Sequence, residues 1–210
     1  MTLFADPAAL RTASRHLARR DARLAAVIRR LGPCGLQRRG DPYRALVRSV
    51  LHQQLAGAAA RAIESRVKAL GGGRIPAPAA LLAISEARLR AAGLSRQKVA
   101  SVHGIAEAFA ERRLVSRRLA QLPDPDVIEA VTRLRGIGEW TAHMLLIFSF
   151  GRPDVLPVGD YGVRKAAMLL YGLRDLPKPR ELEALAEPWR PYRSVATWYL
   201  WRHLEGEAAV

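Results

Sequence analysis

The segment Leu134–Ala142 reads Leu-Arg-Gly-Ile-Gly-Glu-Trp-Thr-Ala and places two glycines around one apolar residue. Its surroundings predict a short helix over Pro125–Leu134, with Asp124 as the N-cap, and a second helix over Glu139–Phe150. Because glycine has no Cβ, the backbone amides of this turn can come close to a phosphate at the positive end of the second helix. Taken alone, a Gly-x-Gly turn is more often an ordinary connection between two helices.

A second informative stretch follows at Leu156–Ala166, Leu-Pro-Val-Gly-Asp-Tyr-Gly-Val-Arg-Lys-Ala. Its Asp160 stands directly before a predicted helix over Tyr161–Tyr171 that Gly172 closes. For an isolated aspartate, capping of that helix is the favoured interpretation. A helix N-terminus also keeps a carboxylate ionised, so capping is compatible with chemistry that needs a fixed negative charge.

Together the two stretches resemble the hairpin and the Gly/Pro-rich loop of the helix-hairpin-helix (HhH-GPD) DNA glycosylase superfamily, and most closely its 3-methyladenine DNA glycosylase II branch. The resemblance covers residues 40–205. It implies that Asp160 is the catalytic carboxylate. It further implies DNA contacts by Gly136, Ile137, Gly138 and Thr141. A structural Na+ or K+ could bind the carbonyl groups of Leu134 and Gly136 in such a hairpin.

The residue type at the position of Trp140 differs between two kinds of enzyme in the superfamily that this sequence resembles. Bifunctional members carry a lysine at the matching position, which attacks the sugar and forms a Schiff base. An indole cannot do this, so the resemblance implies a monofunctional enzyme of base excision repair. It would hydrolyse the N-glycosidic bond of alkylated purines, of the 3-methyladenine and 7-methylguanine type, and leave an abasic site. The alternatives are a bifunctional glycosylase/lyase and a non-catalytic helix-hairpin-helix module, and the Asp160 loop counts against the latter.

The remaining site residues are implied by the same resemblance. Leu51–Arg61 is similar to the segment that fills the gap left by an extruded nucleotide, with Leu55 as the wedge and Gln54 as its polar neighbour. Without the family, Leu55 would be interpreted as a core residue and Gln54 as a helix-end residue. The base pocket would comprise Trp140, Met144, Tyr161 and Trp201.

The amino-acid composition indicates which class of binding partner and which cofactors to expect. The 34 Lys and Arg residues against 19 Asp and Glu give a net charge of +15, which favours a polyanion such as double-stranded DNA carrying damaged bases. An arginine-rich proteome or an acidic membrane could explain the same charge. Cys34 is the only cysteine, so we expect no disulfide framework, no cysteine-ligated metal and no iron–sulfur cluster. We expect no cofactor other than the hairpin cation.

Neither a signal peptide nor an apolar span of about 18 residues is evident, so we expect a cytoplasmic, nucleoid-associated monomer with no membrane contact. No stretch alternates with period two over the length of a strand, so the predicted fold is all-α. By resemblance it has two helical lobes with the active cleft between them. One is the central domain, 43–152, with the hairpin at 134–142. The other combines 1–42 with 153–210 and carries the aspartate loop.

Overall fold

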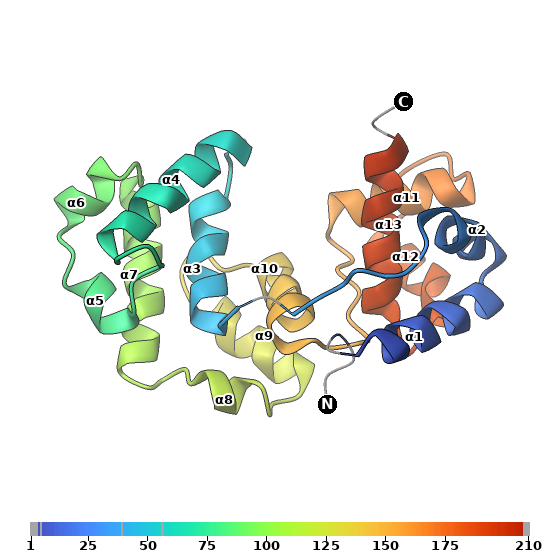
Figure 1. The fold of residues 1–210 in the computed structure, drawn as a ribbon, viewed down its shortest axis with the longest axis horizontal. Coiled ribbons are helices and arrows are strands. Elements are labelled where there is room, and N and C mark those ends of the chain that lie inside the picture. Colours follow the sequence, from blue (N-terminus) through green and yellow to red (C-terminus); the bar gives the residue numbers. More distant parts are fainter. Residues whose placement is uncertain (1–3, 5, 39, 56, 208–210) are drawn as a thin grey trace. The chain divides into compact units, whose positions relative to one another are not determined.

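The computed structural model describes residues 4, 6–38, 40–55 and 57–207. Within these residues the secondary structure is entirely helical, which confirms the all-α prediction (Figure 1). The elements are α1 Pro7–Arg20, α2 Ala22–Leu31, α3 Pro42–His52, α4 Gly57–Leu70, α5 Pro78–Leu82, α6 Glu86–Ala91, α7 Arg96–Ala110, α8 Ser116–Leu119, α9 Asp124–Thr132, α10 Glu139–Met144, the π-helix η2 Leu145–Phe150, α11 Tyr161–Tyr171, α12 Pro179–Leu185, the 3-10 helix η3 Glu187–Trp189 and α13 Arg193–Glu207.

The chain divides into two compact units. The central unit is Arg39–Leu145, and the terminal unit combines Met1–Arg38 with Leu146–Val210. The sequence-based boundaries at 42/43 and 152/153 therefore lie a few residues beyond the boundaries of these units. The structural boundary between Leu145 and Leu146 falls inside η2, just after the first residue of that helix.

Aspartate side chains cap the N-termini of α1, α2 and α3. Asp6 accepts a hydrogen bond from the Ala8 amide at 2.8 Å. Asp21 accepts from two amides of the first turn of α2, at 3.0 and 2.9 Å. Asp41 accepts from the Arg44 amide at 3.2 Å. Each carboxylate satisfies amides that have no partner within the helix, so the starts of these helices follow from local sequence.

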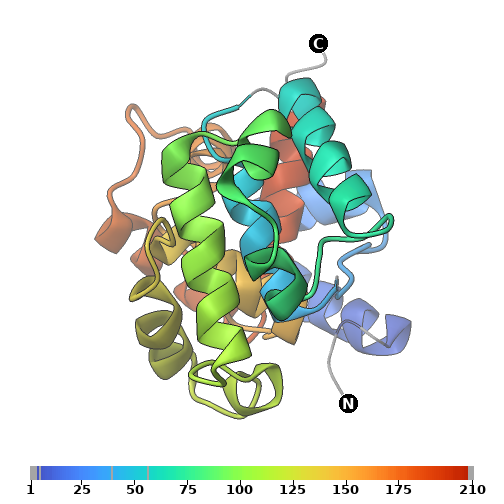
Figure 2. The ribbon, with the colours of Figure 1, turned by 90° about the vertical axis from the view of Figure 1, so that its left-hand side faces the viewer.

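The core of the central unit forms around α7, which packs against α3 and α5. Figure 2 faces this unit and shows α7 running along its length. Apolar residues at helical spacing make the contact, and each stabilises the fold by about 1.5–3 kcal/mol when it is fully buried. These are Leu46 and Val50 on α3, Leu81 on α5, and Val99, Val102 and Ile105 on α7. Helix α7 ends at Ala110, and Arg112 just beyond its end adopts a left-handed φ of 59°.

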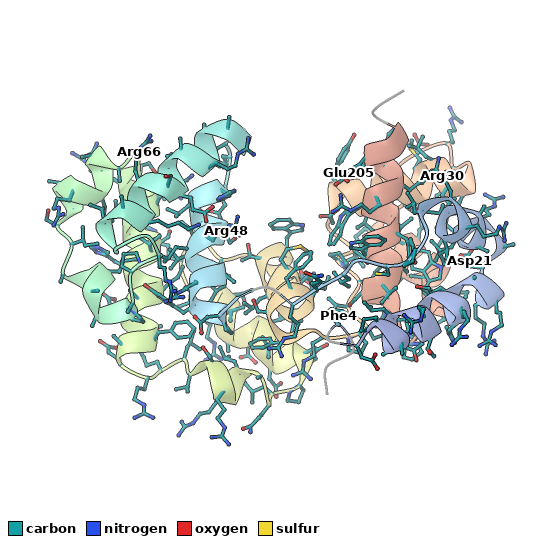
Figure 3. The ribbon with its side chains drawn as sticks, viewed as in Figure 1. Phe4, Asp21, Arg30, Arg48, Arg66 and Glu205 are labelled. Atoms are coloured by element: carbon teal, nitrogen blue, oxygen red, sulfur yellow. The ribbon has the colours of Figure 1, made fainter. Side chains whose placement is uncertain are left out.

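The terminal unit packs α13 against α1, α2 and α11. Asp21, labelled in Figure 3, joins α2 to α11 and η3. Besides capping α2, it accepts hydrogen bonds from the Tyr171 hydroxyl and, at 2.8 Å, from the indole N–H of Trp189. Trp189 and Tyr199 are fully buried, and the Tyr199 hydroxyl donates to the carbonyl oxygen of Gly32 at 2.9 Å. The side chain of Trp189 therefore belongs to the core.

The helices beside the glycine turn differ from their predicted bounds. The first begins at Asp124, with Pro123 as its N-cap, and ends at Thr132. The second is α-helical only as far as Met144 and then widens into the π-helix η2. The sequence there is Leu-Leu-Ile-Phe-Ser-Phe, and most of these side chains are buried. A helix buried on nearly all sides shows no amphipathic period, so its sequence cannot distinguish an α-helix from a π-helix.

Candidate functional site

The glycine turn forms the predicted helical hairpin between α9 and α10. The Ile137 amide donates to the Leu134 carbonyl oxygen at 3.1 Å, and the Ile137 side chain is buried beneath the turn. Gly136 adopts a φ of 81°, which residues with a side chain rarely adopt. A Cβ at this position would also lie 2.7 Å from Oγ of Ser101 on α7. Both the backbone conformation and the packing therefore require glycine.

The N-terminus of α10 follows the turn directly. Its N-cap is Gly138, which provides no capping side chain and at which a Cβ would meet nothing within 4 Å. The space beside this backbone is therefore open to a ligand. The Thr141 side chain, by contrast, is buried, and its Oγ1 lies 3.2 Å from Oγ of Ser49. Any contact of Thr141 with DNA is consequently left to its main chain.

The predicted wedge lies in the turn that joins α3 to α4. Gln54 is exposed and has a left-handed φ of 55°, and the Leu55 side chain is 38% exposed. Leu55 is thus not a core residue, which excludes the interpretation that this side chain belongs to the core. Insertion between bases remains a prediction.

Two neighbouring residues that sequence reasoning did not single out for this site fix that turn. The Lys98 ammonium group donates to the carbonyl oxygens of Leu51 and Gln53, at 2.8 and 2.9 Å. The Gln53 side-chain amide donates to the Gly136 carbonyl oxygen at 2.8 Å. No local pattern marks these bonds, because they join residues 45 to 83 positions apart.

In the terminal unit, Asp160 is only 8% exposed. Its Oδ1 accepts hydrogen bonds from the Val163 amide at 2.8 Å and from the indole N–H of Trp201 at 3.0 Å. The first bond is the helix cap that the sequence indicated. A Cβ at Gly162 would lie 3.1 Å from the same oxygen, which is a tight contact. Two N–H donors on one oxygen hold the carboxylate in one orientation.

The orientation of Trp201 is set by a second contact. Its ring stacks on Phe148 of η2, with centroids 5.9 Å apart and an interplanar angle of 16°. The indole therefore uses its N–H for Asp160 and a ring face for Phe148. Phe148 was not anticipated, because it lies in the segment that the sequence predicted as a regular α-helix.

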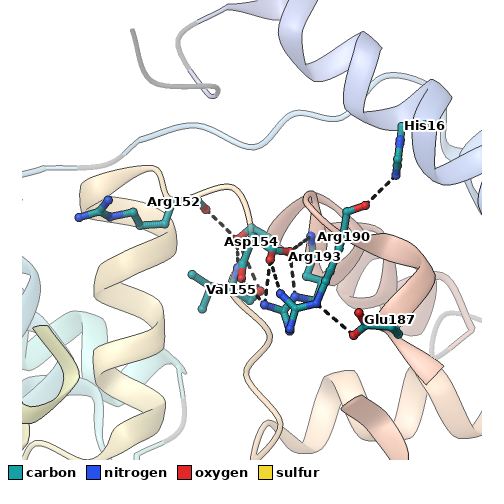
Figure 4. Close-up of polar contacts among 8 residues, drawn as sticks. His16, Arg152, Asp154, Val155, Glu187, Arg190 and Arg193 are labelled. Atoms are coloured by element: carbon teal, nitrogen blue, oxygen red, sulfur yellow. Dashed lines mark hydrogen bonds and ion pairs between the residues drawn. The ribbon is translucent and has the colours of Figure 1, made fainter. Parts of the chain in front are cut away.

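The loop that leads to Asp160 is tied to the start of α13 by charged groups (Figure 4). Asp154 Oδ1 accepts from Nε of Arg193 at 2.8 Å, and Asp154 Oδ2 accepts from Arg190 at 2.8 Å. The Ser194 hydroxyl donates to the Arg152 carbonyl oxygen at 2.7 Å and accepts from the Val155 amide at 3.0 Å. These bonds hold the Asp160 loop against the helix that carries Trp201.

The other predicted pocket residues belong to two different units. Trp140, 48% exposed, and the partly buried Met144 lie on α10 of the central unit. Tyr161, 64% exposed, begins α11 of the terminal unit, in which Trp201 is partly buried. Within the terminal unit the structure brings Asp160 and Trp201 into contact. Within the central unit it places Gln54 and Leu55 in a turn that is bonded to the glycine hairpin.

The carbonyl oxygens expected to bind a cation lie in the same hairpin. The Leu134 carbonyl oxygen accepts from Ile137 and that of Gly136 accepts from Gln53. A carbonyl oxygen has two lone pairs, so each can still bind a hard monovalent cation. Among the described residues no group of three or more His, Cys, Asp or Glu side chains is arranged to hold a metal ion.

In this same part of the chain, no helix is both long and apolar enough to cross a membrane.

Sequence comparison relates the chain to DNA repair proteins. A family model described as "HhH-GPD superfamily base excision DNA repair protein" matches residues 47–191. DNA-3-methyladenine glycosylase 1 of Schizosaccharomyces pombe is 35% identical, over 86% of this chain and 80% of that protein. An alkylbase DNA glycosidase-like protein of the same yeast is 28% identical, over 90% of this chain and 92% of the relative.

Solved structures show the same relationship. A 3-methyladenine DNA glycosylase of Schizosaccharomyces pombe in complex with abasic DNA has a TM-score of 0.83 and 33% identity, covering 91% of this chain and 95% of the other. A DNA-3-methyladenine glycosidase from Bacillus halodurans has a TM-score of 0.84 and 37% identity, covering 92% and 89%.

Proposed function

This chain belongs to the HhH-GPD superfamily of base excision DNA repair proteins, and we propose that it is a monofunctional DNA glycosylase for alkylated purines. It hydrolyses the N-glycosidic bond of bases of the 3-methyladenine and 7-methylguanine type and leaves an abasic site. The observation that carries this proposal is the buried Asp160 carboxylate, whose Oδ1 accepts from the Trp201 indole and from the first turn of α11. The similarity to proteins named as 3-methyladenine glycosylases supports the substrate class.

Asp160 acts on the sugar in this mechanism. As the bond between C1′ and the base breaks, its electron pair leaves with the base and positive charge develops on the deoxyribose. A fixed carboxylate stabilises that charge without reorganisation. Water then adds to C1′, and its proton passes to the carboxylate. The two N–H bonds to Oδ1 hold Asp160 in place for both roles.

A cationic alkylated purine needs little further assistance. It carries a positive charge before cleavage and leaves as a neutral base, so a second carboxylate to protonate the leaving group is unnecessary. We place Trp140, Tyr161, Trp201 and Met144 against the extruded base. An indole or phenol ring attracts a cationic base by about 0.5–2 kcal/mol. The flexible thioether of Met144 allows bases of different shape.

Duplex DNA is held by the central unit. In our proposal the backbone around Gly136 and Gly138 binds a phosphate, because Gly138 adds neither a capping side chain nor a Cβ to the space beside it. Leu55 fills the gap left by the extruded nucleotide, with Gln54 beside it. The net charge of +15 favours the same polyanionic partner. We propose that the protein works as a monomer.

Base release distinguishes this function from its alternatives. A duplex containing 1,N6-ethenoadenine and a methylated DNA are incubated with the protein, and free base and strand breaks are measured separately. We expect free alkylated base, with strand breaks only after alkali. A covalent adduct trapped by borohydride would show a glycosylase/lyase instead, and salt-sensitive DNA binding without base release would show a binding module.

We also propose that Na+ or K+ binds at the Leu134 and Gly136 carbonyl oxygens. The cation would lie beside the phosphate and stabilise the turn. Replacing NaCl or KCl by tetramethylammonium chloride at equal ionic strength should then weaken DNA binding. Equal affinity in the three salts would contradict a cation at this place.

A further inference from the structure

Two parts of the central unit that we assign to DNA are joined directly. One is the hairpin, 134–142, and the other is the turn Gln53–Leu55, which we call the wedge turn. The Gln53 side-chain amide crosses between them and donates to the Gly136 carbonyl oxygen at 2.8 Å. The bonded carbonyl belongs to the glycine whose φ of 81° makes the hairpin.

Lys98 holds the other side of the wedge turn. Its ammonium group bonds the carbonyl oxygens of Leu51 and Gln53, which lie at the C-terminal end of α3. Carbonyl groups in the last turn of a helix lack partners within the helix, and a cation there is favoured by the helix dipole. Burial lowers the pKa of Lys98. Its two bonds to backbone carbonyl oxygens give Lys98 a structural role.

The same face of α7 also supports the hairpin. Ser101 lies three residues after Lys98, so both side chains project from one side of the helix. Its Oγ donates to the Gln97 carbonyl oxygen at 3.0 Å, which fixes the hydroxyl against Gly136. Thus α7 contacts the wedge turn through Lys98 and the hairpin through Ser101. Gln53 bonds the wedge turn directly to the hairpin.

The wedge turn has a conformation that needs such support. Gln54 has a φ of 55°, a region that non-glycine residues rarely occupy. Leu55, the residue that follows Gln54, is 38% exposed. Residues in such conformations persist where surrounding contacts determine them, and here those contacts come from Lys98 and from the hairpin.

We propose that Gln53 is a positioning residue that couples insertion of Leu55 to phosphate binding by the hairpin. The inference rests on the proposed function. When the hairpin binds a phosphate, the Gln53 bond fixes the distance from that phosphate to Leu55, so the side chain enters at one defined base step. Without the bond, the hairpin still binds DNA, but the wedge turn moves independently and nucleotide extrusion becomes less favourable.

The test replaces Gln53 by Met, which has a similar length but no donor, and by Glu, which places an oxygen against the Gly136 carbonyl oxygen. Gln121→Met, at an exposed glutamine after α8, is the matched control. We expect Gln53→Met to lower single-turnover base release about three- to tenfold, the value of one hydrogen bond, and Gln53→Glu to lower it further. The Kd for undamaged duplex should change less than about twofold in Gln53→Met.

A double-mutant cycle with Leu55→Ala separates coupling from a general loss of structure. In the wild-type background Leu55→Ala should reduce extrusion, read from the fluorescence of 2-aminopurine at the target position. In the Gln53→Met background the same change should have a much smaller effect. Additive effects, or a Kd that rises in parallel with the loss of base release, would overturn the proposal.

The extrusion measurement is made in the Asp160→Asn background, in which no chemistry is required. A wild-type protein that releases no base would contradict the proposed function. A wild-type protein that releases base, with additive Leu55 and Gln53 effects on extrusion, would contradict the coupling alone. The two failures are therefore distinguishable. Far-ultraviolet circular dichroism of the Gln53 variants should match the wild type, and if Gln53→Met does not fold, Gln53→Glu provides the same cycle.

Discussion

The hairpin of the central unit and the aspartate of the terminal unit contribute to one proposed reaction through different groups. The hairpin offers backbone atoms, and its turn is formed by glycines within one short segment, with added contacts from Gln53 and Ser101. Asp160 offers a side chain, and its orientation comes partly from Trp201, 41 residues away. Main-chain sites thus depend on glycine and on local geometry. Side-chain sites depend on how distant helices pack, which makes them more sensitive to isosteric changes that alter only one polar group.

The largest effect is expected for the side-chain site. Asp160→Asn keeps an oxygen acceptor for Val163 and Trp201 but removes the negative charge, so base release should fall about a hundredfold or more. DNA affinity should be retained, because this residue contributes to the transition state. Single-turnover base release and a binding titration measure the two quantities. Asp175→Asn, at an exposed aspartate of the same unit, should leave both unchanged.

A smaller effect is expected when only the donor to that carboxylate is removed. Trp201→Phe keeps a ring that can stack on Phe148 but loses the N–H bond to Asp160, so base release should fall about tenfold. In the Asp160→Asn background the same substitution should change the residual rate little. An equal loss in both backgrounds would mean that Trp201 acts on the base and not through the carboxylate.

The hairpin allows a matched comparison of two glycines. Gly136→Ala forces a side chain into a left-handed conformation and against Ser101, and should lower the free energy of unfolding by about 1–2 kcal/mol. Gly138→Ala has an ordinary φ of −98° and open space, so it should fold normally. It should nevertheless weaken DNA binding, because its Cβ occupies the space of the phosphate. Thermal melts and duplex titrations would separate the two roles, and unchanged DNA affinity of Gly138→Ala would argue against phosphate binding there.

The smallest effect concerns a buried carboxylate that supports α3 and α4 and has no assigned catalytic part. Burial alone would raise the pKa of Glu64, but hydrogen bonds from Lys68 and His52, together with the charge of Arg48 (labelled in Figure 3), outweigh it and lower the pKa. Its contribution to stability is therefore present above the unfolded-state pKa and is lost as pH falls through the folded-state pKa.

Glu64→Gln should consequently lower Tm at neutral pH by about 2–4 °C, roughly 1 kcal/mol. The difference from wild type should shrink as the pH is lowered below 4.5, the ordinary pKa of this group. Thermal unfolding between pH 7 and pH 3 measures it. A difference that stayed constant over this range would show that the glutamate charge does not stabilise the fold.

Sequence was sufficient for features that depend on a few consecutive residues. Asp6, Asp21 and Asp41 announce helix starts because a carboxylate beside free amides is a local arrangement. Asp160 indicates a helix N-cap and, together with the hairpin, a catalytic site. The C-terminal ends of α7 and α9 depend on turn conformations and tertiary contacts, which neighbouring residues alone do not set.

By itself the sequence determined the helical class, the glycine hairpin, the aspartate before α11 and the family. It could do so because backbone conformation, capping and the lack of a Cβ are properties of neighbouring residues. Only the tertiary structure decided that Trp201 donates to Asp160 and that Gln53 bonds Gly136. It also decided that Lys98 bonds a carbonyl group in the last turn of α3 and that η2 is a π-helix. Those features join residues tens of positions apart or depend on burial from all sides, and they are formed by the packing of helices.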